Sequence, residues 1–276
     1  MKEKKEKLGY IVPDELWARW EPLIPAPPNT HRFGGGRPRR SDRDCANAIF
    51  FVLRTGCQWE ALDATGLCPH STAHDRFQEW VECGVWQRLW QEAVDCYDEL
   101  RGLDWSFLCA DGSMTKAPLA WEKSGPNPTD RGKQGVKRSL LTDGQGIPLS
   151  VVAAGANVND HKLLEQTLCE MVVARPLPNA EQPQGLCLDK GYDYDQTRHI
   201  GKSHRLELHL RTREEDRPKD WPSGWKPRRW VVERTASWLN RFRGLLVRWE
   251  KKAANYVAML QCACACIAFQ QAGLFG

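Results

Sequence analysis

From Trp105 onward the chain alternates between short apolar runs and amphipathic runs, and the order of these runs limits the fold more than any other feature. SFLCAD reads as one strand, and KRSLLTDGQGIPLSVVAAG reads as two strands joined by Asp143-Gly144, a pair typical of hairpin turns. After these come a helix over HKLLEQTLCEMV, the strand GLCLD, a helix from about Tyr194, the strand RLELHLR and a long helix from about Arg228. The predicted order is therefore strand, hairpin, helix, strand, helix, strand, helix.

This order is typical of the ribonuclease-H-like fold, an α/β fold in which helices pack on a mixed sheet. We predict it for residues 103–276, after a helical domain over residues 1–102. Asp111 ends the first predicted strand and Asp189 ends the fourth, so both carboxylates emerge at one sheet edge if these strands are neighbours. Two adjacent carboxylates repel each other unless a hard cation binds both. The sequence therefore predicts a metal site there.

The long helix expected near the C-terminus supplies a third acid. Glu233 is the only acid between Asp220 and Glu250, and residues 226–252 hold nine Lys or Arg against two Glu, a local charge of 9 − 2 = +7. A charge run is usually a solvated helix face, but one acid among arginines and tryptophans fits a phosphate-binding surface with one metal ligand. Two Mg²⁺ or Mn²⁺ ions on Asp111, Asp189 and Glu233 would support in-line displacement at phosphorus.

The N-terminal region reads as a small helical bundle that binds DNA. RFGGGRPRR, residues 32–40, can lie along a phosphate backbone through Arg37, Arg39 and Arg40, with a solvated loop as the alternative. Residues 41–55, 71–82 and 86–100 each have helical spacing of apolar residues. The second of these helices, which contains STAHDRF, can present three polar side chains to a DNA groove, although a purely structural helix is the alternative. These three are Thr72, His74 and Arg76.

Several of these segments resemble one protein family. GRPRRSDRDCANAIFFVLRTGCQWEAL and FQEWVECGVWQRLW resemble the helical DNA-binding region of DDE transposases of bacterial insertion sequences, in the group called IS five. ADGSMTKAP, TDGQGIPLSVVAAGANVNDHKLL, LDKGYD and RRWVVERTASWLNRFRGLLVRWEK resemble that group's successive acidic motifs. The resemblance implies that Asp111, Asp189 and Glu233 are the DDE triad.

The resemblance departs from one superfamily signature, Tyr-x2-Arg-x3-Glu-x6-Lys. Arg229 and Glu233 match it, whereas Lys226 replaces the tyrosine and Asn240 the lysine, so Arg241 is expected to take over a phosphate contact. Further candidate DNA contacts, each with a solvated or packing role as its alternative, are Lys116, Lys133, Lys137, Arg138, Lys190, Tyr192 and Arg234. Asp160-His161 is expected to be a helix start outside the site.

The family implies a transposase that cleaves double-stranded DNA at terminal inverted repeats and joins the 3′ ends to target DNA, as a homodimer on DNA. Two alternatives stay open on the residues alone. The first is a structure-specific ribonuclease-H-like endonuclease that hydrolyses without joining. The second is a catalytically silent DNA-binding repressor derived from a transposase. The flanking DNA discriminates among the three, because short terminal inverted repeats favour mobility.

Composition indicates a cytoplasmic protein with no membrane partner. No signal peptide is evident, and no apolar run is expected to approach the roughly 20 residues of a spanning helix. The chain of 276 residues holds eleven cysteines, an odd number, which favours reduced thiols. Cys262, Cys264 and Cys266 alternate with alanine, a spacing that suits buried thiols better than zinc ligands.

Overall fold

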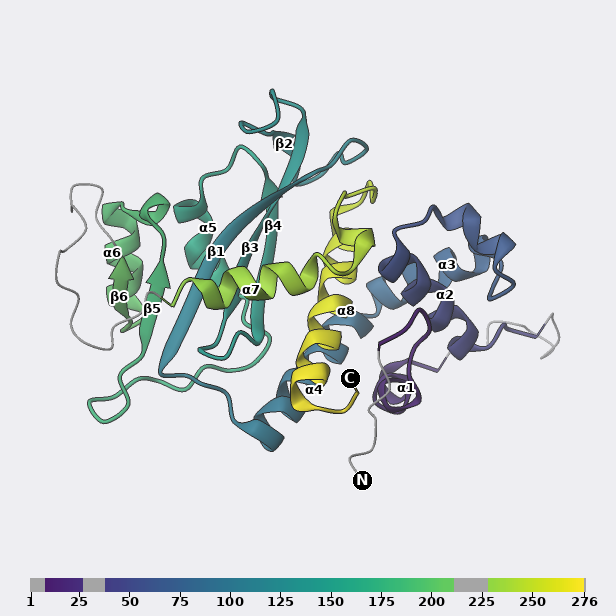
Figure 1. Ribbon diagram of the computed structural model, residues 1–276, viewed down its shortest axis with the longest axis horizontal. Coiled ribbons are helices and arrows are strands. Elements are labelled where there is room, and N and C mark those ends of the chain that lie inside the picture. The colour runs from purple at the N-terminus through teal and green to yellow at the C-terminus, as the bar shows by residue number, and fades with distance from the viewer. Residues whose placement is uncertain (1–7, 27–37, 211–227, 276) are drawn as a thin grey trace.

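A computed structural model describes residues 8–26, 38–210 and 228–275. At its centre lies one mixed sheet (Figure 1). Its main strands, in spatial order, are β4 (Pro148–Gly155), β3 (Gln134–Thr142), β1 (Phe107–Lys116), β5 (Gly185–Leu188) and β6 (Glu207–Leu210), and the short β2 (Gly125–Pro126) pairs with the start of β3.

The strand directions give the topology that the sequence predicts. β1 pairs antiparallel with β3, and β3 pairs antiparallel with β4, as a meander. β5 then returns on the other side of β1 and runs parallel to it, and β6 runs parallel to β5. Three antiparallel strands followed by two parallel ones, with helices as crossovers, is the ribonuclease-H-like order, so the predicted fold class is confirmed.

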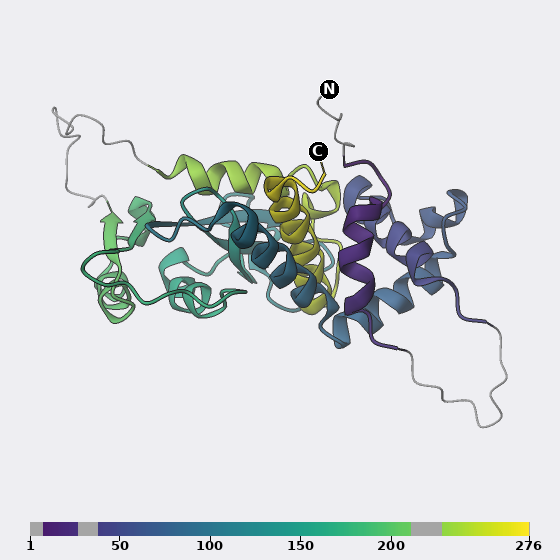
Figure 2. The ribbon, with the colours of Figure 1, turned by 90° about the horizontal axis from the view of Figure 1, so that it is seen from below.

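Helices cover both faces of this sheet. Figure 2 shows α7 (Trp230–Leu239) on one face, and α5 (Asp160–Cys169) and α6 (Asp195–Ser203) on the opposite face. α5 packs on β3 and β4, whereas α7 packs across β1 and β3. Side chains of the central strands therefore alternate between an α5 face and an α7 face, and this alternation positions the site.

The C-terminal helix α8 (Ala253–Ala272) is the core helix of the protein, and it packs along α4 (Val85–Arg101). This helix of 20 residues contains an 18-residue window with a mean hydropathy of 1.3, so the expectation that no apolar run approaches membrane-spanning length was wrong. However, 78% of its apolar window is buried inside the protein, as in a soluble core helix. Cys262, Cys264 and Cys266 are buried there, and all eleven cysteines are free thiols.

The N-terminal helices are held together by tryptophans. α1 (Asp14–Trp20), α2 (Asp42–Thr55) and α3 (His70–Glu82), with the short turns η1 (Glu21–Leu23) and η2 (Trp59–Ala64), pack beside α4. Trp20, Trp80 and Trp86 are buried, and their rings meet edge-on with centroids 5.1–5.8 Å apart. Because α4 also packs on α8, one continuous core joins this region to the sheet, and the division at residue 102 stays a prediction.

The predicted long helix from Arg228 is shorter than expected. α7 ends at Leu239, a single turn η4 (Arg243–Leu245) follows, and the chain then approaches the end of β1. A Cβ at Gly244 would lie 3.1 Å from backbone oxygens of α2, so this turn packs directly on the N-terminal helices. The fully buried Arg248 then donates hydrogen bonds to the carbonyls of Lys123, Glu250 and Lys251. These bonds fix an extended segment where a helix would have continued.

Candidate active site

The register between β1 and β5 brings Asp111 and Asp189 together. Cys109 pairs with Cys187 at the last paired position of these parallel strands. Two residues further along each strand lie Asp111 and Asp189, so both acids reach the same edge. The expectation that Asp111 ends its strand was wrong, because β1 continues to Lys116 against β3 alone. The two acids therefore lie where β1 loses its parallel neighbour.

Backbone amides orient both carboxylates. The amide of Gly112 donates to Oδ1 of Asp111 at 2.9 Å. Asp189 caps the turn η3 (Lys190–Tyr192), where its Oδ1 accepts from the amide of Gly191 at 2.8 Å. Within the described residues the Oδ2 atoms of both aspartates accept no hydrogen bond. One oxygen of each carboxylate is thus oriented by the backbone, and the other is available to an added cation.

The surroundings of Asp111 disfavour its negative charge. The pKa of Asp111 is raised to about 6, mainly by burial and in smaller part by the carboxylates of Asp189 and Asp160. The Arg229 guanidinium and the Gly112 amide act in the opposite direction. A carboxyl group in such surroundings is stabilised as an anion when a cation joins it. The electrostatics of the site therefore suit a bound divalent metal.

Glu233 lies on α7, which crosses β1, the strand that carries Asp111, and β3 (Figure 1). Its Oε1 accepts from Nη2 of Arg229 at 2.8 Å, and both side chains are about half exposed. Since the charge of Arg229 also acts on Asp111, this arginine lies between the two acids. An exposed pair of this kind contributes about 0–1 kcal/mol, so a metal ion can compete for Glu233.

Asp160 lies beside Asp111, although the sequence predicts for it only the start of a helix outside the active site. It is the first residue of α5, and its Oδ1 lies 3.0 Å from Nζ of the buried Lys137. A Cβ at Gly112 would lie 2.7 Å from Cγ of Asp160 and closer still to Oδ1. The carboxylate of Asp160 thus lies against the backbone directly after Asp111. Only glycine leaves room for it, and no spacing in the sequence indicates this contact.

Three residues predicted to touch DNA are buried instead. Lys137 is 6% exposed and pairs with Asp160, and Arg138 is 4% exposed and donates to Oδ1 of Asn240. Tyr192 is fully buried beneath the site, and burial raises its pKa well above the usual value. Their positions correct these three predictions, because the side chains are used inside the protein. Lys137 and Arg138 are consecutive in β3, so their side chains point to opposite faces of the sheet. Both are buried because helices cover both faces.

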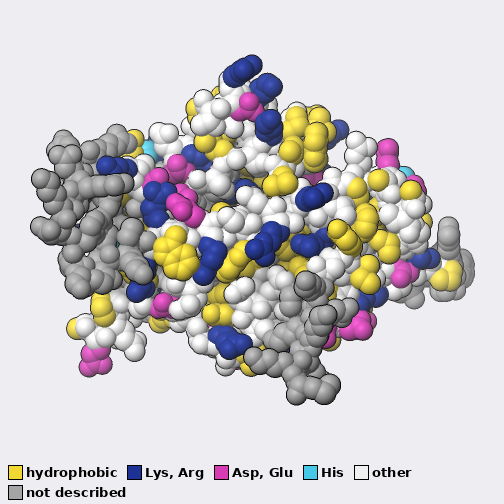
Figure 3. Space-filling view, viewed as in Figure 1, with side chains coloured by type: hydrophobic (Ala, Val, Ile, Leu, Met, Phe, Trp, Pro, Cys, Tyr) yellow, Lys and Arg dark blue, Asp and Glu magenta, His cyan; other side chains and the backbone are white. Residues whose placement is uncertain are grey.

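Other predicted contacts near the acids remain accessible. Lys133, Lys190 and Arg241 are exposed, and Lys116 is 64% exposed at 3.8 Å from Asp130. Figure 3 shows a row of dark blue basic side chains across the middle of the face on which α7 lies. Arg234 is partly buried, with its guanidinium 4.8 Å from the ring of Trp230 and 4.7 Å from that of Trp238. These tryptophans hold Arg234 beside an accessible cationic surface.

In the N-terminal region the predicted arginines are paired with acids. Arg39 bonds Glu79 at 2.7 Å, and Arg40 bonds Asp44 at 2.9 Å. Arg76 is 5% exposed and forms an ion pair with Asp42. The prediction that Arg76 faces a DNA groove is corrected by this burial.

The remaining candidates of this region are less constrained. Thr72 and His74 are partly exposed on α3, and the His74 ring meets Trp59 edge-on at 5.1 Å. Arg37 lies outside the described residues. DNA contact by these three residues stays a prediction.

Fold and site together define a class. A ribonuclease-H-like sheet that carries two aspartates in register, with an acidic residue on the helix across it, is the framework of a metal-dependent phosphoryl-transfer protein. Residues 12–90 match the family described as "Putative transposase of IS4/5 family", and residues 102–267 match the family described as "Transposase DDE domain". The chain belongs to the DDE transposases of insertion sequences, and it is a DNA transposase.

Two curated relatives and one solved structure are similar to this chain. The chain is 36% identical over 147 residues to the "Putative transposase for insertion sequence element IS402" of Burkholderia cepacia, which covers 52% of this chain and 68% of that one. It is 34% identical over 119 residues to the "Insertion element IS402 uncharacterized 16.2 kDa protein" of the same organism, which covers 43% of this chain and 81% of that one. A solved Mos1 mariner paired end complex with Mn overlaps 88% of this chain and 82% of its own, at 12% identity and a TM-score of 0.28.

Proposed function

We propose that this transposase cleaves DNA at the terminal inverted repeats of its insertion sequence and joins the freed 3′ ends to target DNA. The observation that carries the proposal is the parallel register of β1 and β5, in which Cys109 opposite Cys187 brings Asp111 and Asp189 to one edge. α7 adds Glu233 on the same side of the sheet. Three carboxylates beside an accessible basic surface suit a reaction at the DNA backbone.

The donor atoms fit a hard divalent cation. All three side chains offer carboxylate oxygens, the ligands that Mg²⁺ and Mn²⁺ prefer. Burial around Asp111 makes a cation there favourable. We propose that Asp111, Asp189 and Glu233 hold two Mg²⁺ or Mn²⁺ ions, which would activate a water or a 3′ hydroxyl and stabilise the leaving oxygen.

The residues of the chain itself bind and orient the DNA. Arg229 pairs with Glu233 in this structure, and it becomes available to a phosphate when a metal takes that carboxylate. Exposed Lys190 follows Asp189 directly, and exposed Arg241 follows the end of α7, so both can contact the backbone that flanks the reacting phosphate. Trp230 is 52% exposed on α7 and offers a face for a splayed base.

Joining two ends of one element requires two active sites, and therefore we propose a homodimer on DNA. Because its substrate is the genome that carries the element, the protein acts in the bacterial cytoplasm. Both statements follow from the reaction and are tested with it.

The experiment compares wild type with Asp189→Asn on element-end DNA, a supercoiled target plasmid and Mg²⁺. Joined products are expected from wild type alone, and gel shifts are expected from both proteins. Asp195→Asn is the matched control, since this fully exposed aspartate lies nearby at the start of α6. Equal joining by Asp189→Asn would contradict the proposal. Cleavage without joining by wild type would favour an endonuclease, and binding without either reaction would favour a repressor.

A further inference from the structure

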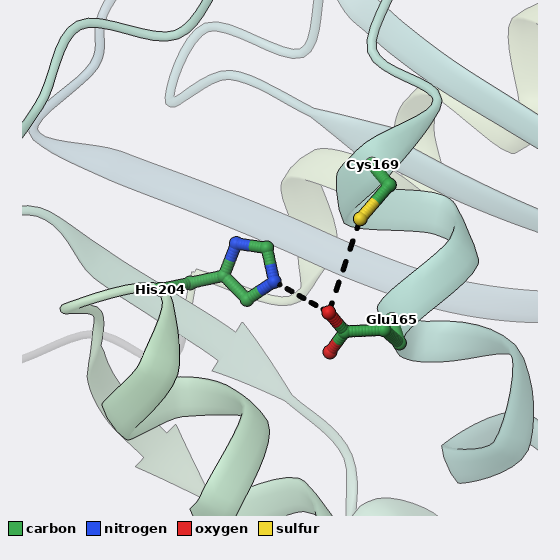
Figure 4. A group of neighbouring side chains, drawn as sticks. All are labelled: Glu165, Cys169 and His204. Atoms are coloured by element: carbon green, nitrogen blue, oxygen red, sulfur yellow. Dashed lines mark hydrogen bonds and ion pairs between the residues drawn. The ribbon is translucent and has the colours of Figure 1, made fainter.

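Two helices behind the sheet bring together a glutamate, a cysteine and a histidine (Figure 4). Glu165 and Cys169 lie one turn apart on α5, and His204 caps the C-terminus of α6. Nε2 of His204 lies 3.0 Å from Oε1 of Glu165, and Sγ of Cys169 lies 3.9 Å from the same oxygen. One donor atom from each residue lies within 4.8 Å of the other two.

We infer that Glu165, Cys169 and His204 form a zinc site that ties α5 to α6. Thiolate, imidazole and carboxylate are the ligand types that Zn²⁺ takes in proteins, and three of them leave the fourth tetrahedral position to water. The DDE carboxylates offer oxygen alone, which suits Mg²⁺ or Mn²⁺. Two kinds of ligand set in one chain thus select two kinds of metal ion.

The three side chains are already oriented toward one point. A separation of four residues places Glu165 and Cys169 on one face of α5. The backbone of His204 is fixed at both ends, because its amide donates to the carbonyl of Ile200 at 3.0 Å and its carbonyl accepts from Arg175 at 2.8 Å. A cation therefore finds a nearly assembled site and replaces the two contacts that His204 and Cys169 make with Oε1 of Glu165.

The Cys169 thiol lies beside the carboxylates of Glu165 and Glu170. Burial raises the pKa of the Cys169 thiol, and the carboxylates of Glu165 and Glu170 raise it further. The metal-free thiol therefore keeps its proton beside two acids. Binding of Zn²⁺ replaces that proton with a bond to the sulfur, so one proton leaves to solvent for each ion bound.

The position of the cluster gives the metal a structural consequence. α5 begins at Asp160, whose carboxylate packs against Gly112 next to Asp111. α6 begins six residues after Asp189, at Asp195. A metal that joins the far ends of these helices holds the two segments that flank the aspartates in one arrangement. The zinc site is argued from these helices alone and does not rest on the proposed DNA reaction.

The test uses the full chain and Co²⁺ as a spectroscopic substitute for Zn²⁺. Wild type is expected to show a thiolate-to-cobalt charge-transfer band, to retain one zinc per chain after free metal is removed, and to lose the band when Zn²⁺ is added. Cys169→Ser is expected to abolish the band, and His204→Gln to weaken zinc binding by more than the roughly 100-fold that loss of an outer-shell partner can cost. Cobalt bound by the DDE carboxylates gives no thiolate band, so the two sites are distinguished.

Cys83→Ser is the matched control, because Cys83 is an exposed cysteine elsewhere in the chain. It is expected to keep both the band and the zinc. Thermal unfolding of each metal-free variant checks that the folds are equal, and Zn²⁺ is expected to raise the melting temperature of wild type but not of Cys169→Ser. A band that persists in Cys169→Ser would overturn the inference. Wild type that keeps no zinc would overturn it equally, and the cluster would then be an ordinary ion pair beside a thiol.

Discussion

The N-terminal helices and the region after Arg228 are both rich in arginine, yet their arginines are used differently. In the N-terminal region Arg39 and Arg40, just before α2, and Arg76 on α3 each form an ion pair with a carboxylate. Around α7, Arg241 is exposed and has no acid within ion-pair distance among the described residues. Charge that is neutralised within the protein stabilises the fold, whereas charge without a partner is available to a phosphate backbone.

Sequence spacing accounts for part of this difference. Arg76 has Glu79 three residues later on α3, which is an ion-pair spacing on a helix, and Arg40, just before α2, has Asp44 four residues later. Residues 226–252 hold only Glu233 and Glu250 as acids, so most of their cations have no local partner. The position of acids is therefore a better guide to a DNA surface than the number of arginines.

The largest expected effect is the loss of folding stability when a paired arginine of the N-terminal region is removed. Arg76→Ala removes a 5% exposed guanidinium and its ion pair with Asp42, which keeps only Arg39 at 4.0 Å. We expect the free energy of unfolding to fall by about 3 kcal/mol, as when a buried pair loses one member. Urea unfolding measures this. Arg40→Ala, which breaks an exposed pair, is the control and should cost at most about 1 kcal/mol. A fully stable Arg76→Ala protein with weakened DNA binding would contradict the claim that Arg76 stabilises the fold and does not contact DNA.

The pH dependence of stability tests the surroundings of Asp111 in the metal-free protein. Its folded pKa, about 6, lies above the usual carboxyl value, so the folded state binds this proton more tightly than the unfolded chain does. The resulting stability is present below about pH 4 and is lost as the pH rises through 6. In EDTA, Asp111→Asn should thus be more stable than wild type at pH 7, by up to about 3 kcal/mol.

Urea unfolding of both proteins at several pH values measures that difference. It should shrink toward zero below about pH 3, because Asp111 is then mostly protonated in both the folded and the unfolded state. A difference that stays the same across the pH range would mean that burial does not act on this carboxyl group.

A tight contact behind the site is tested by Gly112→Ala. The added methyl group would overlap the carboxylate of Asp160, which Lys137 holds in place. We expect a loss of about 1–3 kcal/mol in unfolding free energy, as for other overpacked interiors, together with reduced DNA joining. The same substitution in a Lys137→Met, Asp160→Ala background should cost clearly less, because the space is then vacant. An equal loss of unfolding free energy in both backgrounds would show that Asp160 does not fill the space beside Gly112.

Arg241→Ala should have the smallest effect on stability and a clear effect on DNA binding. Arg241→Ala removes an exposed cation, so unfolding should change by no more than about 0.5 kcal/mol. If Arg241 contacts one phosphate, the slope of log affinity against log salt should fall by about 0.9. Fluorescence anisotropy over a salt series measures this slope. Arg40→Ala is expected to leave the slope unchanged, and an equal change in both variants would remove the distinction between the two regions.

The strand order, and the meeting of Asp111 and Asp189 at one sheet edge, could be predicted from the sequence. Short apolar runs and a hairpin dipeptide are compatible with few other secondary structures. The burial of Lys137, Arg138 and Tyr192 could not be predicted from the sequence, since burial depends on which helix covers each face of the sheet. Asp160 reads as an ordinary helix start, and only the overlap with Gly112 gives it a place beside the site. The early end of α7 depends on contacts of Gly244 and Arg248 with distant segments.

The most direct test of the account is Mn²⁺ binding, followed by electron paramagnetic resonance, in wild type, Asp111→Asn and Asp189→Asn. Mn²⁺ prefers oxygen ligands, so the signal reports on carboxylates rather than thiols. Since both aspartates are expected to ligate the metal directly, each substitution should weaken binding by more than the roughly 100-fold that an outer-shell change can cause. The Asp195→Asn control should bind as wild type does. Unchanged Mn²⁺ binding in both aspartate variants would contradict the claim that β1 and β5 build a shared metal site.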